Sequence, residues 1–394
     1  MTDTTADEQM VAEATAELIA KHDPKATPEQ AFLEAQYDAG LAWVHFPVGE
    51  GGLDVSPKLQ RNVLRSISSA GGPIGGMANP IGYGMCGPAV QVHGSAEQKQ
   101  MLRPLFSNEH IWCQLFSEPG AGSDVASLAC KAERDGDEWI INGQKVWTTL
   151  AHISSYGLLI ARTDPDVPKH RGITAFIVDM HADGVETRPL RQMTGDAEFN
   201  EVYFTDARVP DSMRLDDTGR GWAVSITTLM NERVSIGGGT PPRGSGPIAD
   251  LVDAWQTCGS SDPVSRDKVM RLWVDAEVSR LTNLRAAANR RSGTPGPEGS
   301  VAKLAMAELN KSIYEAVVDL MGPAGMTYAS YEDHPTKGGL FGEDQQENFL
   351  RARANSIEGG TSEVLKNILG ERVLGLPGDV RVDKELPWAE VPRS

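Results

Sequence analysis

The segment Phe116–Asp124, with the sequence F-S-E-P-G-A-G-S-D, has residue types that could bring a ligand close to the backbone. Its glycines and other small residues would let amide N–H groups and hydroxyls approach a bound molecule, as they do in loops that bind anionic groups. The segment follows an apolar stretch and enters a region of strand-like periodicity. Taken by itself it predicts a turn, and ligand binding is the second interpretation.

Other patterns that carry chemistry are weaker or missing from the sequence. The glycine-rich run Gly71–Gly76 contains Pro73 and follows no predicted strand, so it predicts a turn and not a nucleotide-binding loop. No Walker loop and no G-x-S-x-G elbow occurs, and the eight histidines have no metal-ligand spacing. We therefore predict no metal site.

The elements that must position such a loop fall into three zones, which predict an N-terminal helical domain (1–110), a middle β domain (111–218) and a C-terminal helical domain (219–394). This α+β order is not the βαβ alternation of a doubly wound dinucleotide fold. The expected helices are Glu8–Lys21, Lys58–Ser69, Ala96–Leu105, Trp222–Ser235, Val264–Arg291, Ser300–Met321 and Gln345–Arg353, with a break at Ser292–Gly299. The expected strands include Gly157–Arg162, Gly172–Asp179 and Glu201–Thr205.

A β-hairpin is expected within the middle zone. Trp139–Ile141 and Lys145–Trp147 read as two strands, and Asn142-Gly143 lies between them. Because Asn-Gly readily adopts the positive φ angles of a tight primed turn, we predict that the chain reverses direction there.

Composition and charge limit the function. The chain has 394 residues, of which 37 are basic and 54 acidic, for a formal net charge of −17. This balance argues against nucleic acid and an anionic membrane as partners, and an anionic ligand would need a local basic or amide-lined site.

No apolar run reaches the roughly 20 residues of a membrane span, and the N-terminal residues are too polar for a targeting peptide. The four scattered cysteines predict buried thiols in a reducing compartment, and hence a cytoplasmic protein.

Four segments together resemble signatures of the acyl-CoA dehydrogenase family. Phe116–Asp124 resembles the family's T-E-P-G-A-G-S-D, and Ile141–Thr149 resembles I-N-G-x-K-x-W-I-T. Gly172–Val178 and Val202–Pro210 follow as later strands, and Ile357–Glu363 resembles E-G-G-T-S-E. The signatures occur in the family's order and span nearly the whole chain. The resemblance implies an N-terminal helical domain, a middle β-barrel or sandwich domain and a C-terminal four-helix bundle.

The resemblance also implies a bound FAD between the β domain and the C-terminal helices. Ser123 would contact the flavin or the CoA moiety, Trp147 would pack near the flavin ring, and Thr149 would hydrogen-bond around its reactive nitrogen. Without the resemblance, Trp147 would be interpreted as a core aromatic residue. The remaining implied contacts are Gln114, Phe116, Ser117 and Gly122 on the flavin or substrate side, and Thr361 and Glu363 at the FAD pyrophosphate and ribose.

The implied reaction needs a base for the α proton and hydrogen bonds that stabilise the developing enolate. Many family members carry the catalytic carboxylate directly before the Gly-Thr of the last signature, where this chain has Gly359. A second group, including isovaleryl- and long-chain-type enzymes, carries it before an arginine on the first long C-terminal helix. We therefore predict Glu232 as the base, Arg233 as its support and a substrate contact, and the Gly359 N–H as a donor to the thioester carbonyl. Glu358 is the rival base and a predicted substrate contact, and the other interpretation of Glu232 is a solvated helix charge.

The implied activity is α,β-dehydrogenation of an acyl-CoA to the trans-2-enoyl-CoA in lipid metabolism, with electron-transferring flavoprotein as acceptor and a homodimeric or homotetrameric assembly. Two family features are missing. No R-x-x-F-G segment occurs around Asp262–Arg266, and Asp319–Pro323 lacks the expected glutamine. These departures keep open the alternative of a non-catalytic subunit of a heteromer. A flavin oxidase or monooxygenase on the same fold also stays open, because the sequence does not show whether oxygen reaches the reduced flavin.

Overall fold

The computed structural model describes residues 4–237, 241–291, 298–328, 344–378, 380 and 383–392. The chain forms two compact units. The first contains residues 1–190, 199–231 and 382–394, and the second contains residues 191–198 and 232–381.

Six helices begin the first unit: α1 (Thr4–Lys21), α2 (Glu29–Asp38), α3 (Gln60–Ser69), α4 (Gly87–His93), α5 (Ala96–Lys99) and α6 (Leu102–Phe106). A buried cluster that includes Phe32, Leu41 and Val63 fills the space between α1, α2 and α3. The single helix expected at Ala96–Leu105 is wrong, because it is two short helices. Pro104 has no N–H to donate to the Gln100 carbonyl and its ring would clash with it, so a continuous helix cannot form there.

The strands of the first unit form one mixed sheet of eight strands in the described part of the chain. Their order is β6-β7-β3-β2-β4-β5-β8, and β1 pairs with β4 in parallel. The strands are β1 (Trp112–Leu115), β2 (Lys131–Asp135), β3 (Glu138–Thr149), β4 (Tyr156–Arg162), β5 (Ile173–Asp179), β6 (Val185–Pro189), β7 (Phe199–Pro210) and β8 (Arg214–Leu215). Helices thus precede and follow a β region, and the predicted α+β class is confirmed.

The hairpin predicted at Asn142-Gly143 is wrong. β3 runs straight through these residues, and the chain reverses at Gly136-Asp137, where Asp135 of β2 pairs with Glu138. Asn142-Gly143 instead forms a bulge opposite β7, at a register shift between Ile141 and Gly143. The Asn142 side chain donates to the Asp206 carboxylate (3.0 Å) and accepts from its N–H (2.9 Å), so tertiary pairing fixes the residue that local propensity assigned to a turn.

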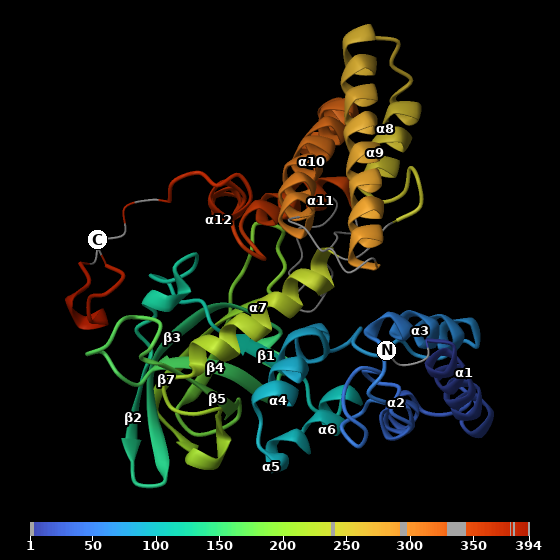
Figure 1. Ribbon diagram of the computed structural model, residues 1–394. Helices are drawn as coiled ribbons and strands as arrows, with labels where there is room; N and C mark the ends of the chain where they lie inside the picture. The colour runs from blue at the N-terminus through green and yellow to red at the C-terminus, as the bar shows by residue number, and fades with distance from the viewer. Residues whose placement is uncertain are drawn as a thin grey trace. The chain divides into compact units, whose positions relative to one another are not determined.

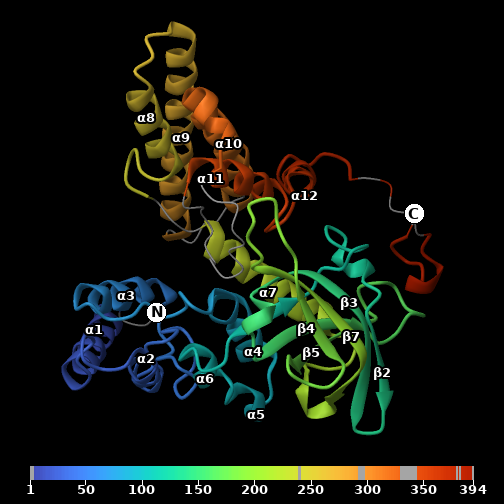
Figure 2. The same cartoon turned by 180° about the vertical axis from the view of Figure 1, so that it is seen from behind.

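Helices make up most of the second unit: α8 (Pro247–Cys258), α9 (Pro263–Arg291), α10 (Glu298–Met321), α11 (Gln345–Arg351) and α12 (Ser362–Ile368). Figures 1 and 2 show α8, α9 and α10 side by side. Leu251 of α8, Leu272 of α9 and Val317 of α10 belong to their shared buried core. Of the predicted break at Ser292–Gly299, residues 292–297 lie outside the described part, and α10 has begun by Glu298.

The cysteines divide in a way that the sequence did not indicate. Cys86, Cys113 and Cys130 are buried, whereas Cys258 is exposed at the end of α8, so the prediction of four buried thiols is wrong for that residue.

Among the described helices, none has both the length and the apolar character needed to span a bilayer. The described residues also contain no group of three or more histidine, cysteine or acidic side chains that could bind a metal ion.

Candidate functional site

A buried ion pair fixes the start of the Phe116–Asp124 loop. The Glu118 carboxylate accepts hydrogen bonds from the Lys145 ammonium (2.8 Å) and from the N–H groups of Ala129 (2.7 Å) and Cys130 (2.9 Å). The Lys145 side chain is completely buried and also donates to the Phe116 carbonyl (3.1 Å). Because charged groups are buried stably only when paired and hydrogen-bonded, this cluster holds the loop in one conformation.

The middle of the same loop faces open space. A tight turn joins Glu118 and Ala121, each donating its N–H to the other's carbonyl (3.1 and 3.0 Å). At Gly120 and Gly122, an added Cβ would meet no atom within 4 Å, so internal packing does not require glycine at either position. Gly122 and Ser123 are exposed. The loop therefore presents backbone and hydroxyl groups without side chains that would obstruct a ligand.

Trp147 lies beside this loop, since the adjacent Val146 N–H donates to the Ser117 carbonyl (2.9 Å). Its side chain is 56% exposed, and its φ of 60° is unusual for a bulky residue. It occupies a register shift between β3 and β7. Strained backbone and exposed aromatic surface are typical of binding sites, so the core interpretation of Trp147 is wrong.

The other predicted residues of the first unit lie on β1, on the Phe116–Asp124 loop and at the end of β3. Gln114 is half-buried on β1, and Phe116 is buried in the core. Thr149 is half-buried at the end of β3. Its neighbour Thr148 is buried, and among the described residues its hydroxyl has no hydrogen-bond partner. The backbone contact from Val146 to Ser117 links the Phe116–Asp124 loop to the end of β3, and the roles of the seven predicted residues of this unit stay predictions.

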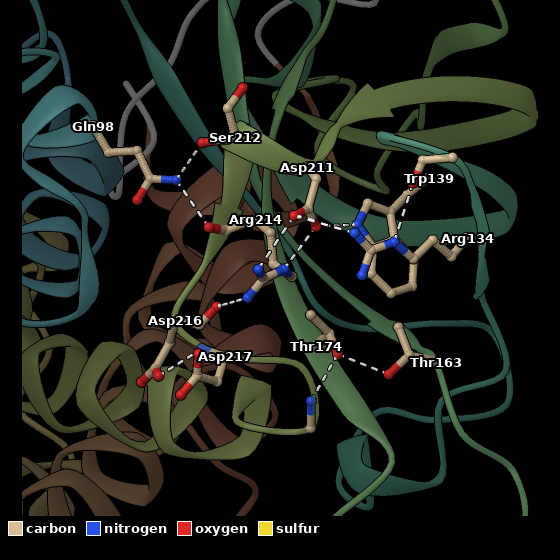
Figure 3. A network of polar contacts seen from close by, with 12 residues as sticks. Gln98, Arg134, Trp139, Thr163, Thr174, Asp211, Ser212, Arg214, Asp216 and Asp217 are labelled. Carbon is tan, nitrogen blue, oxygen red and sulfur yellow. Dashed lines mark hydrogen bonds and ion pairs between the residues drawn. The ribbon is translucent and has the colours of Figure 1, made fainter.

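The segment that leads into helix α7 (Gly221–Gly237) is held by a polar network, which Figure 3 shows. Asp211 accepts hydrogen bonds from Arg214 (2.9 Å) and Trp139 (2.7 Å), and the Arg214 guanidinium donates to the Asp216 carbonyl (2.6 Å). In the connection between β8 and α7, the Gly219 N–H donates to the Thr174 hydroxyl (3.0 Å). These contacts fix the approach of the chain to α7.

His93 adds a second anchor for α7. Its ring nitrogens lie 2.7 Å from the Asp216 carboxylate and 2.9 Å from the Thr227 hydroxyl on α7. The first half of α7 is thereby tied both to α4 and to the segment that precedes the helix. Glu232 and Arg233 lie further along α7, but their side chains fall outside the described residues. Their roles stay predictions.

The Asp211 contacts give a prediction about acid stability. Hydrogen bonds from Arg214 and then Trp139 lower the pKa of Asp211 from 3.8 to about 2. A lowered pKa means that the ionised side chain stabilises the fold fully above pH 3.8, and that this stabilisation is lost as the pH falls through about 2. We expect Asp211→Asn to lower the free energy of unfolding by about 1–2 kcal/mol at pH 7. Urea unfolding at pH 7 and pH 3 should show a smaller difference from the wild type at the lower pH, and an equal difference at both would contradict the assignment.

The last signature forms a tight connection in the second unit. Gly359 and Gly360 have φ angles of 62° and 92°, which glycine adopts without strain. The buried Lys303 ammonium donates to the carbonyls of Asn355 (2.8 Å) and Gly360 (2.6 Å). Among the described residues, no hydrogen-bond acceptor engages the N–H of Gly359, which leaves it able to donate to a ligand.

Glu358 is held by neighbours. Arg351 donates to both carboxylate oxygens (3.1 and 2.9 Å), and Asn355 donates to one of them (2.9 Å). Farther on, Thr361 caps α12 by accepting from the Val364 N–H (3.2 Å), and Glu363 is exposed in the first turn. Glu358, Gly359, Thr361 and Glu363 lie within six consecutive residues, and what they bind remains a prediction.

The residues that support these positions were not predicted from the sequence. Lys145 lies in a strand between Gly143 and two apolar residues, Val146 and Trp147, a pattern that could have indicated a buried partner carboxylate. Nothing in the sequence pointed to Glu118 as that partner, because the two are 27 residues apart. Lys303 likewise contacts carbonyls 52 and 57 positions away, whereas Arg351 and Glu358 are only seven positions apart.

Three family models match the chain. They are described as acyl-CoA dehydrogenase N-terminal domain over residues 4–109, middle domain over residues 113–207 and C-terminal domain over residues 219–374.

Relatives from Mycobacterium tuberculosis are similar over most of the chain. Acyl-CoA dehydrogenase IpdE1 is 35% identical over 345 residues, which are 87% of this chain and 86% of the relative. Acyl-CoA dehydrogenase FadE34 is 37% identical over 89% of this chain, and the chain spans about half (47%) of FadE34.

Two solved structures share the fold at 25% sequence identity. The Tcur3481-Tcur3483 steroid ACAD has a TM-score of 0.70, over 96% of this chain and 99% of that chain. The ChsE4-ChsE5 complex from Mycobacterium tuberculosis has a TM-score of 0.69, over 96% of this chain and 100% of that chain.

Proposed function

Because the chain belongs to the acyl-CoA dehydrogenase family, whose members are FAD-dependent oxidoreductases, we propose that it removes one hydrogen from each of the α and β carbons of an acyl-CoA thioester and forms the trans-2-enoyl-CoA. The observation that carries this proposal is the loop from Glu118 to Ser123, anchored by the buried Glu118–Lys145 pair, beside the exposed, strained Trp147.

The residues of that loop fit FAD. An added Cβ at Gly120 or Gly122 would enter open space that a ligand could fill, and Trp147 offers an exposed aromatic face to a planar ring. The buried Thr148 hydroxyl, without a partner among the described residues, is a further polar group in this region. We assign Gln114, Phe116, Ser117, Gly122, Ser123, Trp147 and Thr149 to this cofactor site, with Thr361 and Glu363 at its pyrophosphate and ribose. When bound, FAD would supply the acceptor for the hydride from the β carbon.

Glu232 takes the α proton in this proposal. A carboxylate beside an apolar acyl chain loses solvation, which makes its protonated form more favourable and suits it to act as a base. α7 carries Glu232, and its first half is anchored by His93 through Thr227. Arg233 supports the base and contacts the substrate.

The C-terminal signature polarises the thioester. The N–H of Gly359 donates to the thioester oxygen and stabilises the negative charge that develops as the α proton leaves. Glu358 is a poor candidate for the base, because Arg351 and Asn355 already engage its carboxylate oxygens. Its role is to fix the connection that presents Gly359.

One of the similar structures supports a substrate class. The Tcur3481-Tcur3483 protein is a steroid ACAD, so we propose a CoA thioester with a steroid-derived or similarly bulky acyl group for this chain. That protein and ChsE4-ChsE5 each combine two named components, which favours a heteromeric assembly over a homo-oligomer. Electron-transferring flavoprotein is the proposed electron acceptor.

An anaerobic titration tests the function. The protein is purified with added FAD and titrated with short, branched, long-chain and steroid-derived acyl-CoAs while the visible flavin absorbance is followed. We expect the steroid-derived thioester to bleach the flavin, and the enoyl product to appear in equal amount by mass spectrometry. Bound flavin that no thioester bleaches would overturn the proposed reaction, and rapid reoxidation by air would favour an oxidase. A preparation that never holds FAD would favour a non-catalytic subunit.

A further inference from the structure

The last part of the described chain returns to the first unit. Residues 383–392, here called the C-terminal strap, belong to that unit although the chain reaches them from the second one. Figures 1 and 2 show the strap beside the loops of the β domain. It lies beyond the C-terminal family match, which ends at residue 374.

Backbone contacts attach the strap to the connection between β4 and β5. The Trp388 N–H donates to the Val167 carbonyl (2.9 Å), and the Ala389 N–H donates to the Pro165 carbonyl (2.9 Å). Pro387 forms an isolated β-bridge with Pro168. The strap is therefore docked in one register.

The Trp388 side chain contacts the segment that follows the Phe116–Asp124 loop, here called the glycine-serine loop. Its indole N–H donates to the Ser127 carbonyl (3.2 Å), and the Arg162 guanidinium lies 4.8 Å from the centre of its ring. Arg162 is itself buried and donates to the carbonyls of Ala126 (2.6 Å) and Leu128 (3.2 Å). Trp388 and Arg162 together thus engage three consecutive carbonyls.

A lysine bridge adds a contact at the end of the loop. The Lys169 ammonium lies 2.8 Å from the Asp124 carboxylate and 2.8 Å from the Asp383 carboxylate of the strap. Asp124 also accepts from the Ser127 hydroxyl (2.6 Å). The Lys169 side chain is 12% exposed and Asp383 is 28% exposed, whereas Asp124 is 57% exposed, so solvent screens the bridge to Asp383 less than the bridge to Asp124.

The loop is thus held on both sides of the exposed Gly120 and Gly122. The Glu118–Lys145 pair holds the N-terminal end of the loop. The strap contacts Ser127 directly through Trp388, and it reaches Asp124 through Lys169, which bridges Asp124 and Asp383. Gly120 and Gly122 contribute no side-chain packing of their own. The conformation of the residues between the two ends therefore depends on both restraints.

We propose that the C-terminal strap holds the glycine-serine loop in its ligand-binding conformation, and that Trp388 and Lys169 are positioning residues for FAD and acyl-CoA binding. The proposal rests on the proposed function only for the identity of these ligands. A loop that is ordered before binding loses less conformational entropy when the ligand arrives, so loss of the strap weakens binding without altering the reacting groups.

Trp388→Ala in the full chain tests the proposal, with FAD binding and amide hydrogen exchange as readouts. We expect the FAD dissociation constant to rise about tenfold, and exchange to accelerate in peptides covering residues 119–130. KM for the acyl-CoA should rise while kcat changes little. Trp388→Phe retains a ring beside Arg162 and should be intermediate, whereas Glu385→Gln, on an exposed strap residue, should behave as the wild type.

A lower melting temperature of Trp388→Ala with unchanged FAD affinity and unchanged exchange in residues 119–130 would overturn the proposal, since the strap would then stabilise the fold alone. Failure of the proposed reaction is distinguishable. In that case no acyl-CoA bleaches the wild-type flavin, but Trp388→Ala still weakens FAD binding and loosens the loop.

Discussion

Glu232→Gln is expected to slow flavin reduction by the acyl-CoA about a thousandfold while FAD remains bound. Glutamine has nearly the size of glutamate, but its amide cannot accept the α proton. The measurement is the anaerobic bleaching rate in a stopped-flow spectrophotometer, with the FAD content determined from the visible absorbance of the same sample. A rate near that of the wild type would refute Glu232 as the base.

Glu358→Gln is the matched control for that result, because it makes the same change in the rival carboxylate. We expect the variant to keep most of its flavin-reduction rate and to lose stability, since Arg351 loses its charged partner. If Glu358→Gln instead abolishes bleaching and Glu232→Gln does not, the two roles must be exchanged.

Lys145→Met is expected to lower the free energy of unfolding by about 3–5 kcal/mol. The substitution keeps an unbranched side chain of similar length, but it leaves the buried Glu118 carboxylate without its cation. The N-terminal restraint of the glycine-serine loop weakens at the same time, so FAD affinity should fall as well. Chemical denaturation followed by circular dichroism measures the first effect, and flavin titration measures the second.

A double variant separates the cost of the unpaired charge from the cost of altered packing. Glu118→Gln combined with Lys145→Met removes both charges, and we expect it to recover at least about 1 kcal/mol relative to Lys145→Met alone. If the free energy of unfolding of the Lys145→Met variant lies within about 1 kcal/mol of the wild-type value, the assignment of a stabilising buried pair is contradicted.

Local sequence determined the class of fold and the family. Helical and strand-like periodicity place helices before and after a β region, because the side chains of each element alternate with the period of that element. The signatures around Phe116–Asp124 and Ile357–Glu363 identified the family because each is a short run with its own order of residues.

Contacts between distant residues decided what the sequence left open or indicated wrongly. Asn142-Gly143 is a turn by local preference, but its pairing with Asp206 makes it a bulge within β3. Cys258 is exposed because it ends a helix at the surface.

The supports of the candidate site depend in the same way on tertiary structure. Lys145 meets Glu118 across 27 positions, and Trp388 meets Ser127 across 261. Short motifs identify the residues that a ligand could contact, because those residues are close together in the chain. The groups that hold the motifs in place come from wherever the fold buries a matching charge or donor, and only the tertiary structure determines where that is.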